Sequence, residues 1–562
     1  AADRSAALTV QEVDAGAVAA GLDLSGPHGE SQRRAMVALG TGGRAAIAIG
    51  AAGAGKTTLL SGLTQAWSAQ GRTVYGTAVA WRQASALADA GIPEERCLAI
   101  AALLAQARAG TLQLDPEAVI VVDEVSLTSA RDALAILELR EATGCTLIAV
   151  GDPLQGRSVE AGGVVGLLAR AMGDSVAEVA GTVRQRAAEE RELADMARAG
   201  RAGDVLDVLR DQGRARLAAG TVVDAAEAVA ALWEERAAMI GEAAVLVVAP
   251  TREDCRIVSL AIRRRRRAAG RLGPDIVVLD ATDQAGDAYD LPLAVGDRVR
   301  LYSRTHARGA GAGLLGLNGS VVEVRGIETD GLILRSEKGR EGLVPWGTLR
   351  DPETGRIRLG PGFCRSLASA QGSTAEECVV AAPRGSQGID AAAFYVAMTR
   401  HRATSWLVLG EGAERRAVAA RRSIGDATPI RAADIWKNAA ATFARRAGSE
   451  GALDLLDRAA AVRRASEDVF RRGLARLRTR TARGLAPTAV PALVRRRRLA
   501  LTLPPLAEKL EDRAEVLGLV AGRTAALGRQ LAEAVATDAG RAEPRPSAPK
   551  RQQQAQAPAA RP

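Results

Sequence analysis

The chain has 562 residues, a formal net charge of +10 and 47% hydrophobic residues, a composition typical of a globular protein with about three or four domains. It has no apolar run long enough for a membrane helix and no N-terminal signal segment, so we expect a cytoplasmic protein without membrane insertion. Five scattered cysteines without a Cys-x-x-Cys pair, together with only three histidines, argue against zinc, redox and three-histidine metal chemistry.

The first half of the chain has the pattern of an α/β domain. Residues 1–28 are short and uninformative, and we expect them to be a lead-in. Residues 29–183 alternate apolar runs with helical stretches, which predicts a parallel sheet wound with helices. The expected strands of this first domain are Ala45–Ile49, Thr73–Tyr75, Val119–Val122 and Thr146–Val150.

A second α/β domain follows, interrupted by a β-rich segment. Residues 184–240 have a helical pattern broken by glycines and predict a helical connector. Residues 241–273 and 350–412 resume the α/β pattern, with expected strands at Val245–Val248, Cys378–Ala381 and Trp406–Leu409. Between them, residues 274–349 show short strands separated by turn signals such as Asn-Gly, which predict a small inserted β-barrel.

The C-terminal region carries the basic character of the chain. Residues 413–562 hold 30 Lys and Arg against 15 Asp and Glu, whereas residues 1–412 hold 45 against 50. We expect a basic helical region over residues 413–540 and a disordered Pro/Ala/Gln tail over residues 541–562. Such a region suits nonspecific nucleic-acid binding, and protein docking is the alternative.

The clearest motif is a phosphate-binding loop. Gly50-Ala51-Ala52-Gly53-Ala54-Gly55-Lys56-Thr57 fits G-x-x-x-x-G-K-[ST], directly after an expected strand and at the start of a helix. Backbone N–H groups of such a loop surround phosphates, and the helix N-terminus adds partial positive charge. A glycine-rich turn with a chance lysine is the alternative interpretation. The motif predicts ATP binding by Gly50, Gly53, Ala54, Gly55, Lys56, Thr57 and Thr58, with Lys56 on the β- and γ-phosphates and Thr57 on Mg²⁺.

Two further polar groups follow apolar strands. Asp123 and Glu124 end the run Val119–Val122, where Asp123 can hold Mg²⁺ and Glu124 can polarise the attacking water. A helix N-cap is the alternative role for adjacent acids. After the next expected strand, Gly151-Asp152-Pro153-Leu154-Gln155 places Gln155 where it can bond a γ-phosphate or its water, although Gly-Asp-Pro also occurs as a simple turn.

These motifs, in this order, resemble those of superfamily 1 helicases. The resemblance continues in Glu30–Arg33, Thr182–Gln185, Ala249–Arg252, Gln371–Thr374 and Tyr395–Arg400. It implies an α/β fold with two RecA-like P-loop motor domains and an SH3-like β-barrel insertion. It also implies that Gln32 reads adenine and that Arg184 and Arg400 reach the γ-phosphate across a cleft.

Within that superfamily the chain is most similar to the RecD-like branch and to the helicase part of TraA/TraI-type conjugative relaxases of the MobF class. This resemblance implies ATP- and Mg²⁺-dependent DNA unwinding in the 5′ to 3′ direction. Single-stranded and tailed duplex DNA are the implied partners, with relaxosome or secretion-system proteins as further partners. All four tyrosines lie inside the helicase match, so we infer no nicking activity from it.

The expected DNA contacts are Trp81, Ser366, Gln371, Ser373 and Thr374, which lie in segments resembling DNA-contacting motifs. For Trp81, as for Trp346 and Phe363, a place in the core is the alternative to base stacking. The run Arg263–Arg267 is either a phosphate contact or a solvated helix face.

The segment before Gln371 reads Ser366-Leu367-Ala368-Ser369-Ala370 and lacks the histidine and lysine common in relatives. Those residues usually touch DNA or couple it to ATP. Two other functions therefore stay open beside a DNA helicase. One is an ATP-gated single-strand-binding module that does not unwind, and the other is a RecD-like subunit of a recombination nuclease.

Overall fold

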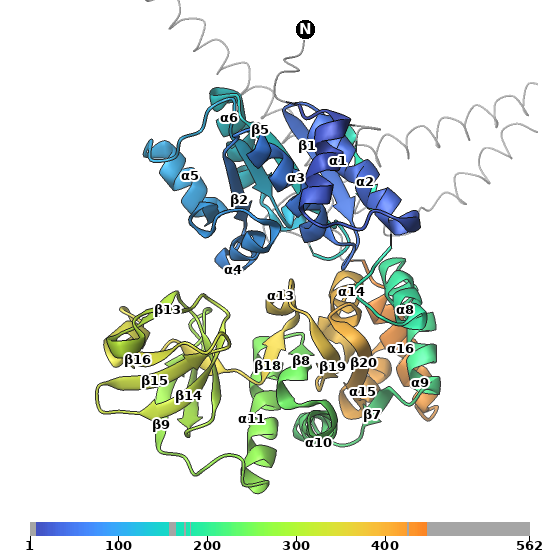
Figure 1. Cartoon of the computed structure of the whole chain (residues 1–562). Coiled ribbons are helices and arrows are strands. Elements are labelled where there is room, and N and C mark those ends of the chain that lie inside the picture. The colour runs from blue at the N-terminus through green and yellow to red at the C-terminus, as the bar shows by residue number, and fades with distance from the viewer. Residues whose placement is uncertain (1–6, 157–163, 173–175, 180, 424–425, 447–562) are drawn as a thin grey trace, which may run out of the picture. The chain divides into compact units, whose positions relative to one another are not determined.

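The computed structural model describes residues 7–156, 164–172, 176–179, 181–423 and 426–446 (Figure 1). Contacts divide the chain into a unit of residues 1–457 and a unit of residues 458–562. Most of the expected basic helical region and the whole expected tail lie outside the described residues. Among the described helices, none combines the length and apolar content that a membrane span requires.

The first domain is built on a six-stranded parallel sheet with the order β3-β2-β4-β5-β1-β6. Every residue of β4 is buried, as a parallel strand covered by helices on both faces requires. Because parallel strands end at one edge, this order brings the ends of β1, β5 and β4 together. The strands are β1 (Ala45–Gly50), β2 (Val74–Ala78), β3 (Cys97–Ala99), β4 (Val119–Val122), β5 (Thr146–Gly151) and β6 (Ala177–Val179).

The expected N-terminal lead-in is wrong, because residues 10–28 contain helices of the first domain. Thr9 and Glu12 form a capping box that starts the first helix, and Val13 and Ala17 on that helix are buried in the core. The Thr-x-x-Glu spacing was the sequence signal for this helix. The helices of this domain are α1 (Val10–Ala19), α2 (Gly26–Thr41), α3 (Lys56–Ala69), α4 (Trp81–Ser85), α5 (Ile100–Arg108), α6 (Ala130–Thr143) and α7 (Val164–Met172).

The second domain has a five-stranded parallel sheet with the order β18-β8-β19-β20-β7. Residues 184–240 are therefore not a purely helical connector, since β7 pairs with β20 in this sheet. Arg216 interrupts the apolar run of β7, so the sequence pattern did not predict this strand. The strands are β7 (Ala215–Ala218), β8 (Val245–Ala249), β18 (Cys364–Ser366), β19 (Ala375–Ala382) and β20 (His401–Gly410), and the expected connector also holds α8 (Ala188–Arg198), α9 (Ala202–Asp211) and α10 (Val222–Ile240).

The second domain also continues beyond residue 412, where we expected the basic region to begin. After α15 (Glu411–Arg421), helix α16 (Ala432–Phe443) places Ile435 and Phe443 in the core of the second sheet. The Phe443 ring stacks on Phe394 with 4.7 Å between centroids. The apolar face of α16 therefore belongs to the second domain.

The β-rich insertion is antiparallel and has its own core. Its largest sheet has five strands in the order β16-β15-β14-β11-β17. It ends at Pro361 rather than at residue 349, because β17 pairs with β11. A closed SH3-like barrel stays a prediction. The strands are β9 (Val277–Thr282), β10 (Ala288–Leu293), β11 (Arg298–Leu301), β12 (Thr305–Ala307), β13 (Gly313–Gly316), β14 (Val321–Ile327), β15 (Gly331–Ser336), β16 (Glu341–Pro345) and β17 (Leu359–Pro361).

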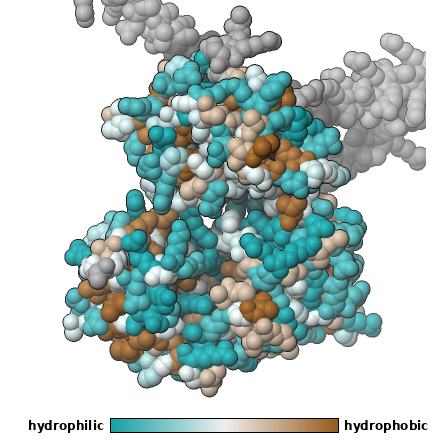
Figure 2. Space-filling model, in the orientation of Figure 1, coloured by the Kyte–Doolittle hydropathy of each residue, from teal (hydrophilic) through white to brown (hydrophobic). Residues whose placement is uncertain are grey.

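The surface face seen in Figure 2 is largely hydrophilic, with separate apolar patches. The helix α11 (Arg252–Ala268) carries the arginine run Arg263–Arg267. These arginines are structural ties rather than free phosphate contacts, because each of the five pairs with a carboxylate. The pairs are Arg263 with Asp275 and Asp297, Arg264 with Glu227, Arg265 with Glu227 and Glu234, Arg266 with Glu242, and Arg267 with Asp275.

We predict that Arg263→Ala lowers the free energy of unfolding by about 3–5 kcal/mol, measured by urea denaturation. The Arg263 side chain is 11% exposed and the Asp297 carboxylate is 3% exposed, at an N–O distance of 2.9 Å. Removing the arginine leaves a buried carboxylate without its cation. Arg264→Ala is the matched control, because its exposed pair is worth only about 0–1 kcal/mol. Equal effects of the two substitutions would contradict this assignment.

Candidate nucleotide and nucleic-acid sites

The loop between β1 and α3 has the backbone of a phosphate cradle. Gly53 and Gly55 have φ values of +76° and +77°, in the left-handed region that favours glycine. A Cβ at Gly53 would lie 2.5 Å from the Arg184 Cβ, and one at Gly55 would overlap the side-chain amide of Gln32. The two glycines are thus required both by backbone conformation and by space.

Lys56 and Gln32 both bond to this loop. The Lys56 Nζ donates to the Gly50 carbonyl at 3.0 Å and to the Ala51 carbonyl at 3.3 Å. The Gln32 Nε2 donates to the Ala54 carbonyl at 3.1 Å, so Gln32 braces the loop, and its reading of adenine stays a prediction. Thr57 and Thr58, in the first turn of α3, are exposed.

The surroundings of the two acids after β4 disfavour negative charge on Asp123. The Asp123 Oδ1 accepts a hydrogen bond from the Glu124 backbone N–H at 2.8 Å. Burial, and then the neighbouring Glu124, raise the pKa of Asp123 to about 7, although Lys56 acts in the opposite direction.

Glu124 itself is held in a sparsely populated backbone conformation. Its φ of 50° makes it the one non-glycine residue with positive φ among the described residues. Its Oε2 is buried and has no hydrogen-bond partner in the described part of the chain. A carboxylate oxygen of this kind is free to accept a proton from water or to bond a ligand.

Arg184 and Arg400 bring two positive charges to the same site. Arg400 is 1% exposed, and its guanidinium donates to the Val396 carbonyl and the Thr399 hydroxyl. Arg184 donates to the Thr399 carbonyl at 2.8 Å. Burial, and then the charge of Arg400, lower the pKa of Arg184 to about 9, whereas Glu124 acts to raise it. Neither arginine forms an ion pair with a carboxylate of the described residues.

Gln155 does not lie free beside the loop. It is 4% exposed, and its Nε2 donates to the Asp152 Oδ2 at 3.2 Å. Asp152 is fully buried at the end of β5 and accepts the Leu154 backbone N–H as well. Gln155 is thus fixed by Asp152, and its bond to a γ-phosphate or its water stays a prediction.

These observations fit a nucleoside triphosphate with Mg²⁺. Arg400 is buried and Arg184 is half-buried, neither forms an ion pair with a described carboxylate, and the glycine loop has the form that accepts an anion. In the described part of the chain, no three His, Cys, Asp or Glu side chains gather as metal ligands. Thr57 and Asp123 are the residues that would hold Mg²⁺, which neutralises phosphate charge when bound.

A second group of residues forms a candidate nucleic-acid interface. Arg82, next to Trp81 at the start of α4, donates to the Ser373 hydroxyl at 2.6 Å and to the Ser369 carbonyl at 3.1 Å. The Arg304 guanidinium lies 5.6 Å from the centre of the half-buried Trp81 ring. Arg82, the neighbour of Trp81 in the chain, thus connects the first domain to Ser373 of the second.

The other predicted contacts have local partners or none. Ser366 is the N-cap of the short helix α13 (Leu367–Ala370) and accepts the Ser369 backbone N–H. Gln371 is 7% exposed and its Nε2 has no partner among the described residues. Thr374 is exposed. Phe363 is a core aromatic that meets Trp233 edge to face at 6.2 Å.

Basic residues that we did not predict continue from Ser373 toward the β insertion. Arg365 lies near the Ser373 hydroxyl and pairs with Glu337. Next to it, Arg300 has a buried Nε without a partner among the described residues. Burial lowers the pKa of Arg82 to about 10, with Arg365 as the second cause. We call Arg82, Arg365, Arg300, Arg252 and Arg256 the arginine track.

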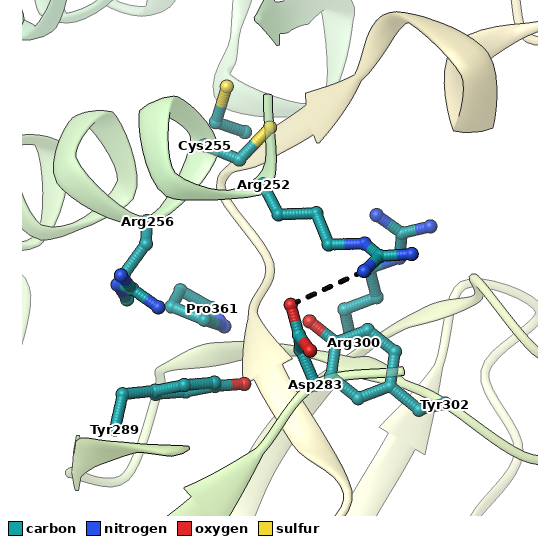
Figure 3. Close-up of a pocket in the computed structure, with 9 residues that line it drawn as sticks. Arg252, Cys255, Arg256, Asp283, Tyr289, Arg300, Tyr302 and Pro361 are labelled. Atoms are coloured by element: carbon teal, nitrogen blue, oxygen red, sulfur yellow. Dashed lines mark ion pairs between the residues drawn. The ribbon is translucent and has the colours of Figure 1, made fainter. Parts of the chain in front are cut away.

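The arginine track ends in a small cavity of about 20 Å³ between α11 and the β insertion (Figure 3). Arg252 reaches Asp283 at 3.6 Å in this cavity. The Arg256 guanidinium lies 5.0 Å from the Tyr289 ring centre, and that of Arg300 lies 5.8 Å from the Tyr302 ring centre. Tyrosine faces beside arginines are the combination that single-stranded nucleic acid favours.

We predict that Asp123→Asn stabilises the protein at pH 8 but not at pH 3.5, measured by denaturant unfolding. The folded chain holds the Asp123 proton up to a pKa of about 7, against 3.8 when unfolded. The carboxylate therefore costs stability as the pH rises from about 4 to about 7, and the cost is fully present above pH 7. A gain of the same size at both pH values would contradict the raised pKa.

Comparison with known proteins finds one family model and several relatives of this chain. Residues 28–220 match a family model described as AAA domain. The probable conjugal transfer protein TraA of Sinorhizobium fredii is 28% identical over 374 residues, which cover 66% of this chain and 32% of that protein. The conjugal transfer protein TraA of Rhizobium radiobacter is 27% identical over 386 residues, which cover 68% and 32%. The chain spans about a third of the length of these curated relatives.

Among solved structures, the chain is similar to Pif1 helicases. Pif1 from Bacteroides in complex with ADP-AlF3 and single-stranded DNA shares 15% identity at a TM-score of 0.42, over 72% of this chain and 98% of that one. Pif1 from Candida albicans shares 14% identity at a TM-score of 0.41, over 71% and 100%. The ordered motifs of the chain resemble those of superfamily 1 helicases, residues 28–220 match an AAA domain, and over about two thirds of its length the chain is similar to the TraA conjugal transfer proteins.

Proposed function

We propose that the chain is an ATP- and Mg²⁺-dependent DNA helicase that moves 5′ to 3′ along single-stranded DNA. The observation that carries this proposal is the pair Arg184 and Arg400 beside the phosphate-binding loop. The guanidinium hydrogen bonds of both arginines go to Ser373, Val396 and Thr399 of the second domain, whereas the loop belongs to the first. An anion bound there interacts with both domains at once, which is the requirement for a motor driven by a nucleotide.

Each residue of the site has a chemical role in hydrolysis. Lys56 exchanges its bonds to the Gly50 and Ala51 carbonyls for the β- and γ-phosphates. Glu124 accepts the proton of the attacking water through its unbonded Oε2. Arg184 and Arg400 stabilise the charge that develops on the γ-phosphate. When that charge leaves, the attraction between the two domains weakens and the site reopens.

Single-stranded DNA would follow the arginine track. Bases would stack on Trp81, and phosphates would contact Arg82 and Arg300, which make no ion pair in the described part of the chain. Ser373 is near this path, because its hydroxyl accepts from Arg82. The β insertion would then contribute to DNA binding through Arg300.

The TraA relatives suggest a place for this motor in conjugative DNA transfer, in the cytoplasm and beside relaxosome or secretion-system proteins. The RecD-like resemblance is the basis for the 5′ to 3′ direction. A single-strand-binding module that does not unwind is a second candidate, favoured by one observation. Ser369 stands in the segment that lacks the usual histidine and lysine, and its carbonyl is already occupied by Arg82.

We expect Lys56→Ala and Glu124→Gln to abolish DNA-stimulated ATP hydrolysis by different routes. Lys56→Ala removes phosphate contacts, so both nucleotide affinity and turnover fall. Glu124→Gln keeps nucleotide binding but lowers kcat by about 10²–10⁴-fold, because the proton acceptor is lost. Phosphate release and the binding of a fluorescent ADP analogue measure the two effects.

Strand displacement on 5′-tailed and 3′-tailed duplexes tests unwinding and its direction. We expect unwinding of the 5′-tailed duplex alone. ATP turnover that ignores DNA and survives Lys56→Ala would refute the motor. Turnover without displacement would favour the binding module, and a requirement for a 3′ tail would refute the direction.

A further prediction concerns the DNA path. Arg300→Ala should weaken binding of a labelled oligo-dT and reduce the salt slope of log Kd by about 0.7, the value for one lost phosphate contact on a single strand. Fluorescence anisotropy at several salt concentrations measures both effects. Arg264→Ala is the matched control, because Glu227 already pairs with that arginine. Equal slopes for Arg300→Ala and the unsubstituted protein would remove the β insertion from the DNA path.

A further inference from the structure

Tyr395 is a buried residue that the predicted chemistry does not use. It lies on α14 (Ala391–Met398), the helix that leads directly into Thr399 and Arg400. Its side chain is 2% exposed. Desolvation by burial raises the pKa of its hydroxyl well above the usual range, so the hydroxyl keeps its proton at working pH. Tyr395 is therefore a permanent hydrogen-bond donor as well as an acceptor.

The Tyr395 hydroxyl joins three segments. It accepts a hydrogen bond from the Ala52 backbone N–H, inside the phosphate-binding loop, at 2.8 Å. It donates to the Asp152 Oδ2, after β5, at 3.0 Å. Two segments of the first domain are thereby tied to α14 of the second domain through one oxygen atom.

Asp152 extends this connection to Gln155. The carboxylate is fully buried, and the oxygen that accepts from Tyr395 also accepts from the Gln155 Nε2 at 3.2 Å. Its other oxygen accepts the Leu154 backbone N–H at 3.1 Å and lies 3.8 Å from Arg198 of α8. A shift of Tyr395 therefore changes the bonding of the side chain predicted to face the γ-phosphate.

We propose that Tyr395 is a positioning residue that couples occupancy of the phosphate-binding loop to Gln155 and Arg400. The inference rests on the proposed ATPase function. Backbone N–H groups of such a loop turn toward phosphates when a nucleotide binds, and Ala52 N–H is one of them. Any movement of that group alters its bond to Tyr395. Tyr395 shares α14 with Val396, whose carbonyl accepts a hydrogen bond from the Arg400 guanidinium, so the movement also reaches Arg400. Tyr395 thus links the phosphate-binding loop and Gln155 to Arg400 without touching the reacting atoms.

Backbone hydrogen bonds form a second connection near the site, and no side chain takes part in them. The Val183 N–H donates to the Gly53 carbonyl, and the Arg186 N–H donates to the Arg402 carbonyl. These bonds follow the covalent connection between the domains and do not reach Gln155. Tyr395 is the side chain, among the described residues, whose hydroxyl bonds both to the loop and to the carboxylate that holds Gln155.

Tyr395→Phe is the direct test, because it removes the hydroxyl and keeps the ring that fills the core. We expect kcat for ATP to fall about tenfold or more, and the ratio of DNA-stimulated to basal turnover to fall with it. KM for ATP and the affinity for a fluorescent ADP analogue should change less than about twofold. A merely structural role would lower the thermal midpoint without this division between kcat and KM.

Tyr75→Phe is the matched control. Tyr75 is also buried, and its hydroxyl donates to the Gln113 carbonyl at 3.3 Å, outside the site. We expect its kcat, KM and stimulation ratio to stay within about twofold of the unsubstituted protein. An equal loss of kcat in Tyr75→Phe and Tyr395→Phe would overturn the proposal, as would an unchanged kcat in Tyr395→Phe.

Asp152→Asn provides a second, independent measurement. If both side chains act through one hydrogen bond, the double variant should be no more than about threefold slower than the slower single variant. Losses of kcat that multiply would overturn the coupling. Failure of the proposed function is distinguishable, because then the unsubstituted protein shows no ATP turnover that depends on Lys56.

Discussion

The proposed function depends on two adjacent arginines, Arg184 and Arg400, that form no ion pair with the described residues. Arg400 is almost fully inaccessible, Arg184 lies beside it, and burial lowers the pKa of both. Such an arrangement costs free energy unless an anion offsets it. The phosphate-binding loop and the acids after β4, both in the first domain, lie beside these arginines. One anion bound there would therefore interact with both domains. The nucleotide chemistry and the domain movement that we propose depend on this arrangement.

The described arginines fall into two kinds, those that form ion pairs with carboxylates and those that do not. On α11, Arg263–Arg267 are each neutralised by carboxylates and fasten the helix to its surroundings. Arg82, Arg256 and Arg300 make no ion pair with the described residues and instead lie against hydroxyls or tyrosine rings. Arginine count alone therefore says little about nucleic-acid binding. What matters is which guanidiniums keep their charge available.

The glycine loop and the acids after β4 were visible in the sequence as local motifs, and their roles in nucleotide binding stay predictions. The sheet core of both domains was likewise visible as apolar runs. Other parts depend on distant contacts: β7 contains Arg216, α16 joins the core through tertiary packing, and β17 is recognised only by pairing with β11. The arginine track and the bonds of Tyr395 are also tertiary, since their partners lie up to 343 residues apart. Sequence patterns describe neighbouring residues and do not predict contacts between residues so far apart in the chain.

The strand order has a consequence for how the chain folds during synthesis. The first sheet is complete once β6 has been made at Val179, so its core can form early. The second sheet places β8 between β18 and β19 and closes only with β20, which ends at Gly410. More than a hundred residues, including the whole β insertion, separate β8 from its neighbours. Pairing across such separations is slow. We therefore expect the first domain to fold during synthesis, before the second sheet is complete.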